Sequence, residues 1–191
     1  FLVPAQKLED LLDFTYQVLK FRFADELFIL NKATLANILG KDAGSIGALK
    51  EKLPAWMVVV GIAGRNMLPE ERVEFQEKDI AEFAQQKGLK MVAEVPGAGN
   101  EELMNTVLGI SREPYWKLTT KGNYQDILFI NTLNRMPEFL DIMESAAGDS
   151  GYPESDIGVY LQPLHQGSSC HCEFTLPFNG HDAAESARMQ K

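Results

Sequence analysis

The sequence predicts an α+β fold with a mainly antiparallel sheet and helices on one face. Short apolar runs rich in β-branched residues, such as residues 56–63, alternate with stretches of helical periodicity. The last two apolar runs, residues 157–164 and 169–176, are separated only by a turn at 165–168, which indicates an antiparallel hairpin. This order of elements fits a ferredoxin-like domain, either single or as two such halves that share one sheet.

The first half of the chain is expected to open with a helix over residues 4–23. Pro4 suits the first turn of a helix, and the apolar side chains from Leu8 to Leu19 recur at helical spacing. The run at 56–63 is continuously apolar and β-branched, which is typical of a central strand. By the same criteria we expect helices at residues 32–40, 43–53, 69–87 and 101–108, strands at 26–31 and 91–95, and a loop at 96–99.

The second half of the chain is expected to follow an irregular joint at residues 111–125, where no periodicity is visible. Asn134 has the side chain of a helix cap, and the apolar spacing that follows it predicts a helix ending at Met143. The remaining expected elements are a strand at 126–133, a turn-rich break at 147–151, the two hairpin strands and a final helix from His181.

Length and composition predict one domain over residues 1–191, with a mass of 21.3 kDa. There are 18 basic and 27 acidic residues, which gives a formal charge of −9. Because the basic residues are scattered along the sequence, we expect neither nucleic acid nor an anionic membrane to be a direct partner. The longest apolar run is far shorter than the ~20 residues that cross a bilayer, and no leader follows Phe1, so we expect a cytoplasmic protein. Two glycine pairs follow predicted strands, Gly61 with Gly64 and Gly97 with Gly99. Neither pair has the spacing of a nucleotide-binding motif.

Two cysteines, Cys170 and Cys172, flank His171 near the C-terminus, and His165 lies close by in the sequence. These are zinc-ligating residue types, but neighbouring strand residues point to opposite faces, so we expect no metal site. The cysteines are instead expected to be reduced and to form a core-facing row with Phe174 and Leu176.

The opposite row of the hairpin is rich in groups that carry protons or form hydrogen bonds. His171 and Glu173 share one face of their strand, while Tyr160 and Gln162 share one face of the preceding strand. Two interpretations stay open at this point, a solvated sheet face and the floor of a binding pocket. In the second interpretation His171, Tyr160 and Glu173 are candidate catalytic residues, and Gln162 and His165 are candidates for binding the substrate.

Two further candidates for substrate binding, Asn131 and Arg135, follow the strand predicted at 126–133. An arginine at this place would hold a substrate carboxylate through two parallel hydrogen bonds. The alternative is a helix cap followed by an ordinary surface charge.

Residues 156–179 (DIGVYLQPLHQGSSCHCEFTLPFN) resemble the C-terminal cap region of flavoproteins of the vanillyl-alcohol oxidase and p-cresol methylhydroxylase type. The preceding order of strand, helix and glycine-rich break fits as well, so the resemblance covers about residues 120–191. It implies a cap whose ferredoxin-like sheet covers a small organic substrate beside the flavin ring of an FAD-dependent oxidoreductase. It also implies that FAD is held mainly by a domain outside this chain, which is then a fragment of a longer flavoprotein.

The resemblance also implies partners and cofactor contacts. His171 lies in a strand similar to the one from which some members attach the flavin, so His171 is the candidate flavin neighbour, and Cys172 is the candidate if the register shifts by one. The implied partners are the FAD-binding domain of the same parent protein, a small-molecule substrate and a second copy of the chain; the isolated chain would be inactive. The alternative is a stand-alone ferredoxin-like module that binds a small molecule or regulates without catalysis.

Overall fold

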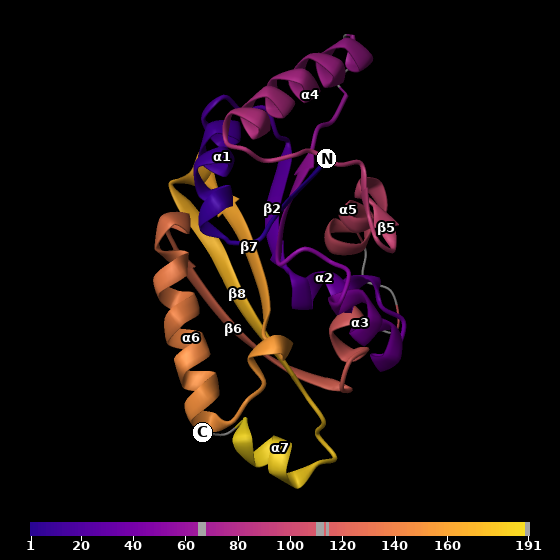
Figure 1. The fold of residues 1–191 in the computed structure, drawn as a ribbon, viewed down its shortest axis with the longest axis vertical. Helices are drawn as coiled ribbons and strands as arrows, with labels where there is room; N and C mark the ends of the chain where they lie inside the picture. The colour runs from indigo at the N-terminus through magenta and orange to yellow at the C-terminus, as the bar shows by residue number, and fades with distance from the viewer. Residues whose placement is uncertain (65–67, 110–112, 114, 190–191) are drawn as a thin grey trace.

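Six strands form one antiparallel sheet in the computed structural model, which describes residues 1–64, 68–109, 113 and 115–189 (Figure 1). The strand order is β1-β3-β2-β7-β8-β6, and β4 and β5 form a separate two-stranded hairpin. The strands are β1 (Leu2–Ala5), β2 (Glu26–Asn31), β3 (Trp56–Gly61), β4 (Glu94–Val95), β5 (Ala98–Gly99), β6 (Asn123–Asn131), β7 (Gly158–Leu164) and β8 (Ser169–Phe178). The α-helices are α1 (Glu9–Lys20), α2 (Lys32–Leu39), α3 (Ala43–Lys50), α4 (Pro69–Gln86), α5 (Asn100–Leu108), α6 (Met136–Ser150) and α7 (Ala183–Arg188).

The sheet consists of two units with the same arrangement. In the first, α1 connects β1 to β2 and the later strand β3 lies between them; in the second, α6 connects β6 to β7 and β8 lies between them. The two units meet where β2 pairs with β7, through the residue pairs Ile29–Leu161 and Leu30–Tyr160. The predicted α+β fold with an antiparallel sheet is therefore confirmed, and the strand order agrees with the second of the two expected arrangements, two halves that share one sheet.

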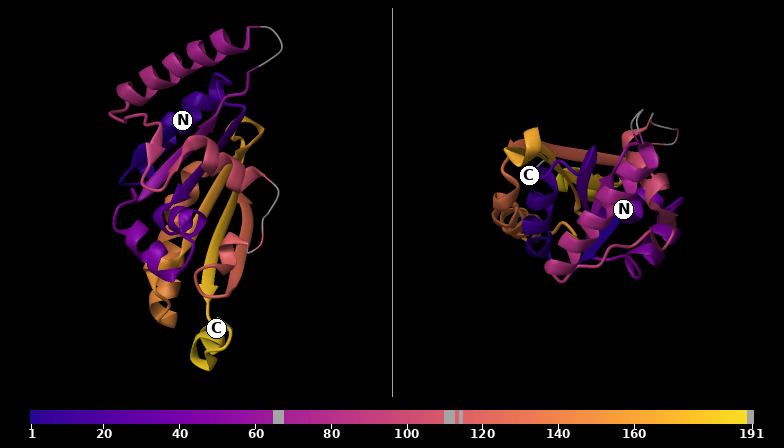
Figure 2. Two further views of the ribbon diagram at one scale, coloured as in Figure 1. Left: turned by 90° about the vertical axis from the view of Figure 1, so that its right-hand side faces the viewer. Right: turned by 90° about the horizontal axis from the view of Figure 1, so that it is seen from above.

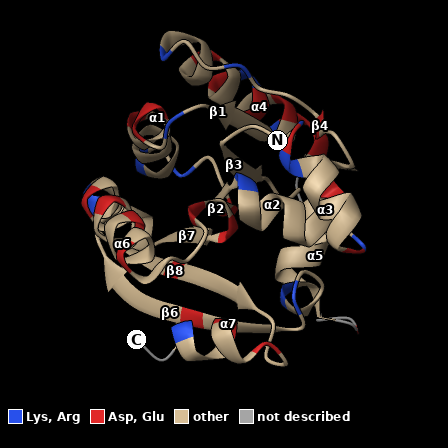
Figure 3. Ribbon diagram, turned by 60° about the horizontal axis from the view of Figure 1, so that its bottom comes forward, with Lys and Arg blue, Asp and Glu red and all other residues tan. Residues whose placement is uncertain are grey.

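Helices pack on both faces of the first unit and on one face of the second (Figures 2 and 3). One apolar core joins α1, α4 and α6 to side chains from both units, such as Val58 and Leu161. The other core joins α2, α3 and α5 to the opposite side of the first unit, including Phe28 and Val59. The expected single helical layer therefore describes the second unit, and the first unit has a second layer.

The second helical layer reaches the second unit only at its inner strand. Helix α2 packs on β7, but farther out Leu128 and Ile130 of β6 are 58% and 61% exposed. This part of the sheet, formed by β6, β7 and β8 on the side away from α6, is called the uncovered face below.

The expected helix over residues 4–23 begins too early. Residues 2–5 form β1, because Leu2 and Val3 are both fully buried on opposite faces of the sheet, and the helix starts at Glu9. Pro4 is tolerated in this strand because β1 is the edge strand of the sheet, where its missing N–H removes no bond to an outer neighbour.

The helix expected from Asn134 to Met143 is displaced at both ends. A short 3₁₀ turn, η2 (Leu133–Arg135), precedes α6, and Asn134 makes no cap with its side chain. At the other end α6 continues through Gly148 to Ser150, because one glycine inside a helix costs only ~1 kcal/mol, and the helix ends at Gly151 with a φ of 70°.

The expected irregular joint at 111–125 is partly regular. A 3₁₀ turn, η1 (Trp116–Leu118), lies within it, and β6 already begins at Asn123. Residues 110–112 and 114 lie outside the described residues, so the first part of this expectation cannot be compared. Similarly, the expected strand at 91–95 is reduced to β4, and the expected loop at 96–99 contains β5.

Across the described ranges, no helix has both the length and the apolar composition that a membrane span needs. Lys and Arg are distributed over separate helices and loops, with acidic residues between them, as Figure 3 shows.

Candidate functional site

The polar row expected from the sequence lies on the uncovered face. Tyr160 of β7 is paired with Glu173 of β8, and Gln162 is paired with His171, so the four side chains share one side of the sheet. The alternate residues of β8 face α6 and the core, and all four are buried, as expected: Cys170, Cys172, Phe174 and Leu176. The alternation of side chains along the strands, read from the sequence, therefore predicts the correct face of the sheet for each of these residues.

His171 and Glu173 are the two ionisable groups nearest each other in this row. Nε2 of His171 lies 3.8 Å from Oε2 of Glu173, and the side chains are 31% and 14% exposed. The ring of Tyr160 meets the His171 ring edge-on at 6.0 Å and stacks on Phe28 at 5.7 Å. Burial, together with the charge of Glu173, raises the pKa of Tyr160, so its hydroxyl stays protonated and keeps a proton to donate.

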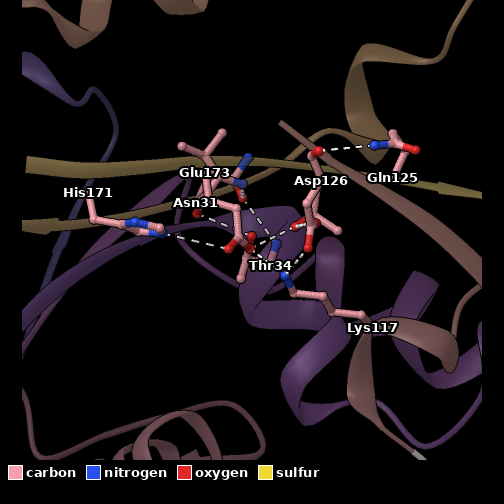
Figure 4. A network of polar contacts seen from close by, with 9 residues as sticks. Asn31, Thr34, Lys117, Gln125, Asp126, His171 and Glu173 are labelled. Carbon is pink, nitrogen blue, oxygen red and sulfur yellow. Dashed lines mark hydrogen bonds and ion pairs between the residues drawn. The ribbon is translucent and has the colours of Figure 1, made fainter. Parts of the chain in front are cut away.

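A buried lysine that the sequence reasoning missed completes the cluster. Nζ of Lys117 lies 2.7 Å from Oδ2 of Asp126 and 2.5 Å from Oε1 of Glu173 (Figure 4). The hydroxyl of Thr175 lies 2.8 Å from Asp126 and 2.9 Å from Glu173 and donates its proton to one of them. Burial lowers the pKa of Lys117, but the hydrogen bonds and charges of the two carboxylates outweigh burial and raise the pKa overall. The ammonium is therefore charged.

Aromatic rings enclose the lysine on the side away from His171. Nζ of Lys117 lies 5.5 Å from the ring centroid of Trp116 and 5.3 Å from that of Tyr124. Tyr115 packs against both rings, at 5.5 and 6.0 Å. A cation facing aromatic rings at these distances is attracted by their π electrons. These rings close one end of the uncovered face.

Three of the residues expected at the site lie elsewhere. Asn131 is paired with Cys170, so it lies on the face of α6, and its side chain accepts a hydrogen bond from the N–H of Thr132. Arg135 is exposed, forms an ion pair with Glu138 at 2.9 Å and lies over the ring of Phe139. Cys172 is fully buried in the core. The structure therefore does not bring these side chains together with His171.

His165 lies in the exposed turn between β7 and β8, the 3₁₀ turn η4 (His165–Gly167), with a φ of 46°. It is separated from the row, although Gln162 extends the row toward the same end of the sheet. A cavity of about 330 Å³ opens there, between the end of α1, the start of β2 and this turn. It is lined by Gln162 and by Leu19, Arg22, Ala24, Asp25, Glu26, Leu27, Pro163 and Gln166.

The cysteines are free thiols in the buried row. The hydrogen bond to Cys172, together with burial, raises the pKa of the Cys170 thiol, so this thiol stays protonated and unreactive. Within the described part of the chain, no three His, Cys, Asp or Glu side chains are grouped as metal ligands.

The polar row and the glycine turns differ in what they could offer to a cofactor. His171, Tyr160 and Gln162 lie on the same side of the hairpin, but the glycine turns do not offer a cradle for a pyrophosphate. A Cβ atom at Gly61 would meet Met104 at 2.5 Å, and Gly97 has a φ of 104°, so side-chain packing explains the first glycine and backbone conformation the second.

The fold matches part of a 4-ethylphenol oxidase from Gulosibacter chungangensis, solved as an isoeugenol complex, with a TM-score of 0.70 at 9% sequence identity. The match covers 99% of this chain and 41% of the oxidase chain. The chain has the fold of a domain within this oxidase. The expected resemblance to flavoproteins of the vanillyl-alcohol oxidase type is therefore confirmed at the level of the fold.

A second solved structure supports the same assignment of the fold. An alkyldihydroxyacetonephosphate synthase matches with a TM-score of 0.58 at 10% identity, over 100% of this chain and 38% of the synthase chain. The chain thus spans about two fifths of the length of either enzyme. No family model and no curated protein matches the sequence.

Proposed function

We propose that this chain is the substrate-covering domain of an FAD-dependent oxidoreductase that oxidises a small organic molecule. The observation that carries the proposal is the uncovered face, where His171, Glu173, Tyr160 and Gln162 lie next to one another on β7 and β8 and the α-helical layer extends only over β7. The likeness in fold to an oxidase of more than twice this length supports it, because such a face is suited to packing over the remainder of a larger enzyme.

Each residue of the face has a role that follows from its chemistry. His171 is placed to accept a proton from a substrate hydroxyl or amine, with Glu173 beside it to stabilise the imidazolium. The protonated hydroxyl of Tyr160 donates a hydrogen bond to a substrate oxygen. Leu128 and Ile130 supply apolar surface that excludes water. FAD, held by the rest of the parent protein, would accept a hydride from the substrate carbon.

The test uses the parent protein that contains this chain together with its flavin-binding part. Substrates of the phenol, alcohol and hydroxy-acid classes are mixed with it, and bleaching of the flavin absorbance is followed by rapid mixing. We expect His171→Ala to slow flavin reduction ~10²-fold, the usual contribution of a positioned proton acceptor. His181→Ala, which changes an exposed histidine in the loop before α7, is the matched control and should reduce flavin at the wild-type rate.

Two results would remove the proposal. One is a parent protein that contains no flavin, and the other is an unchanged rate of flavin reduction in His171→Ala. The cavity beside Gln162 favours a second candidate function, a module that binds a small polar molecule without catalysis. A parent without flavin whose 191-residue region binds such a molecule, with the binding abolished by Gln162→Ala, would establish that alternative.

A further inference from the structure

We propose that Lys117 is a positioning residue, which holds Glu173 so that one carboxylate oxygen faces His171. The inference rests on the proposed function, because it concerns how His171 is oriented in the substrate site. The segment that carries Lys117 precedes β6 and shows no sequence periodicity, so its contribution becomes visible only in the folded chain.

The burial of Lys117 is the first observation. Its side chain is 6% exposed, whereas lysine almost always keeps its ammonium in water. Replacing a buried ion pair by apolar residues is often neutral or stabilising, so stability alone is a weak reason for this arrangement. Fixing the geometry of neighbouring groups is an alternative reason, and the hydrogen bonds support it.

The two oxygens of Glu173 have different environments. Oε1 accepts a hydrogen bond from Nζ of Lys117 at 2.5 Å, and the hydroxyl of Thr175 lies 2.9 Å from the same oxygen and 2.8 Å from Asp126. With Oε1 fixed, Oε2 is directed along β8 toward Nε2 of His171 at 3.8 Å, as Figure 4 shows. Asp126 of β6 binds the same ammonium at 2.7 Å, so the lysine joins β6 to β8 at this point.

The backbone that delivers Lys117 is itself anchored on both sides. Trp116 packs against the core formed by α2, α3 and α5. Thr120 donates a hydrogen bond of 2.8 Å from its hydroxyl to Oδ1 of Asn37 in α2. The lysine therefore reaches the carboxylates from a fixed support, and its side chain is not free to follow a moving Glu173.

The first experiment measures the geometry and does not depend on the function. In the 191-residue chain, three-bond NMR couplings about χ1 of Glu173 and His171 should report one rotamer for each side chain. We expect Lys117→Met to average both sets of couplings and Lys117→Arg to restore them. The double variant Lys117→Met with Asp126→Asn keeps the net charge of the cluster and should average them as well. Circular dichroism confirms that each variant is folded, and unchanged couplings in both Met variants would overturn the proposal.

The second experiment measures the consequence in the flavin-containing parent protein. Lys117→Met should slow flavin reduction by ~10–10²-fold, as expected when a reacting group is misplaced by about 1 Å, with a much smaller change in KM. In the background of His171→Ala, Lys117→Met should cause no further loss, because it acts through His171. Losses that multiply would overturn the positioning role. If His171→Ala itself causes no loss, the proposed function is wrong, and the NMR couplings alone decide whether Lys117 holds Glu173.

Discussion

Asn31 ends β2 at the junction of the two units, and its side chain makes three hydrogen bonds there. Its Nδ2 donates to the carbonyl of Ile157 at 2.7 Å, while its Oδ1 accepts from the N–H groups of Val159 at 2.9 Å and Thr34 at 3.0 Å. The side chain thus caps α2 and continues the pairing of β2 with β7, which comprises just two residue pairs.

Asn31→Ala removes all three bonds at once. Each contributes ~1 kcal/mol net, so we expect the free energy of unfolding to fall by ~3 kcal/mol. The assay is urea unfolding of the 191-residue chain followed by circular dichroism. With a slope of ~2–3 kcal/mol per molar urea, the midpoint should fall by ~1 M or more.

Two further variants make this measurement decisive. Asn31→Asp keeps the two acceptor bonds and loses the donor to Ile157, so its loss of stability should be smaller than that of Asn31→Ala. Asn134→Ala changes an exposed asparagine whose side chain makes no cap, and it should stay within ~0.5 kcal/mol of wild type. A loss below ~1 kcal/mol in Asn31→Ala would refute the view that this side chain joins the two units.

Two other predictions concern stability. Gly151 has a φ of 70° at the end of α6, whereas Gly148 lies inside the same helix with open space where a Cβ would be. Gly151→Ala should therefore lower the free energy of unfolding by ~1 kcal/mol, and Gly148→Ala should raise it by a similar amount. The melting temperature should move in the same direction in each variant. If both changes have the same sign, the backbone explanation is wrong. Burial raises the pKa of Asp156, but hydrogen bonds and charges from Lys50 and Lys121 outweigh burial and lower it overall. A carboxyl group whose pKa is lowered on folding stabilises the fold at pH values above its unfolded pKa of ~3.9. This stabilisation is lost as the pH falls through the folded pKa, so urea midpoints should decline below about pH 4. Asp156→Asn should flatten that decline, and an unaltered decline would count against the pairing.

The hairpin shows what local sequence determines. The alternation of Cys170, Cys172 and Phe174 with His171 and Glu173 gives both faces of β8 directly, because the side-chain period of a strand is two. The same reasoning does not place Asn131, since its face depends on how β6 pairs with β8. The contact between Lys117 and Glu173 joins residues 56 positions apart, and no local pattern marks such a contact.

The start of the chain shows how packing outweighs local preference. Pro4 and the spacing of the following leucines suit a helix, but Leu2 and Val3 fill the cores on the two faces of the sheet. The strand is therefore favoured because pairing with β3 buries both side chains, and β3 lies more than 50 residues away in the sequence. Gly148 suggests that α6 ends early, but the helix continues past this glycine. The burial of Ala147 in the core is one contact that stabilises the helix at this point.

Strand β6 is the outer strand of the sheet on the side of the second unit, and it carries apolar residues on both faces. Leu128 and Ile130 are exposed on one face and Ile127 on the other, while no described strand pairs with its outer edge. A long apolar edge of this kind is a template for the addition of further strands from other chains. Preparations of the isolated chain are therefore expected to self-associate through β6 as the concentration rises, and a lysine at position 128 or 130 is the direct way to prevent it.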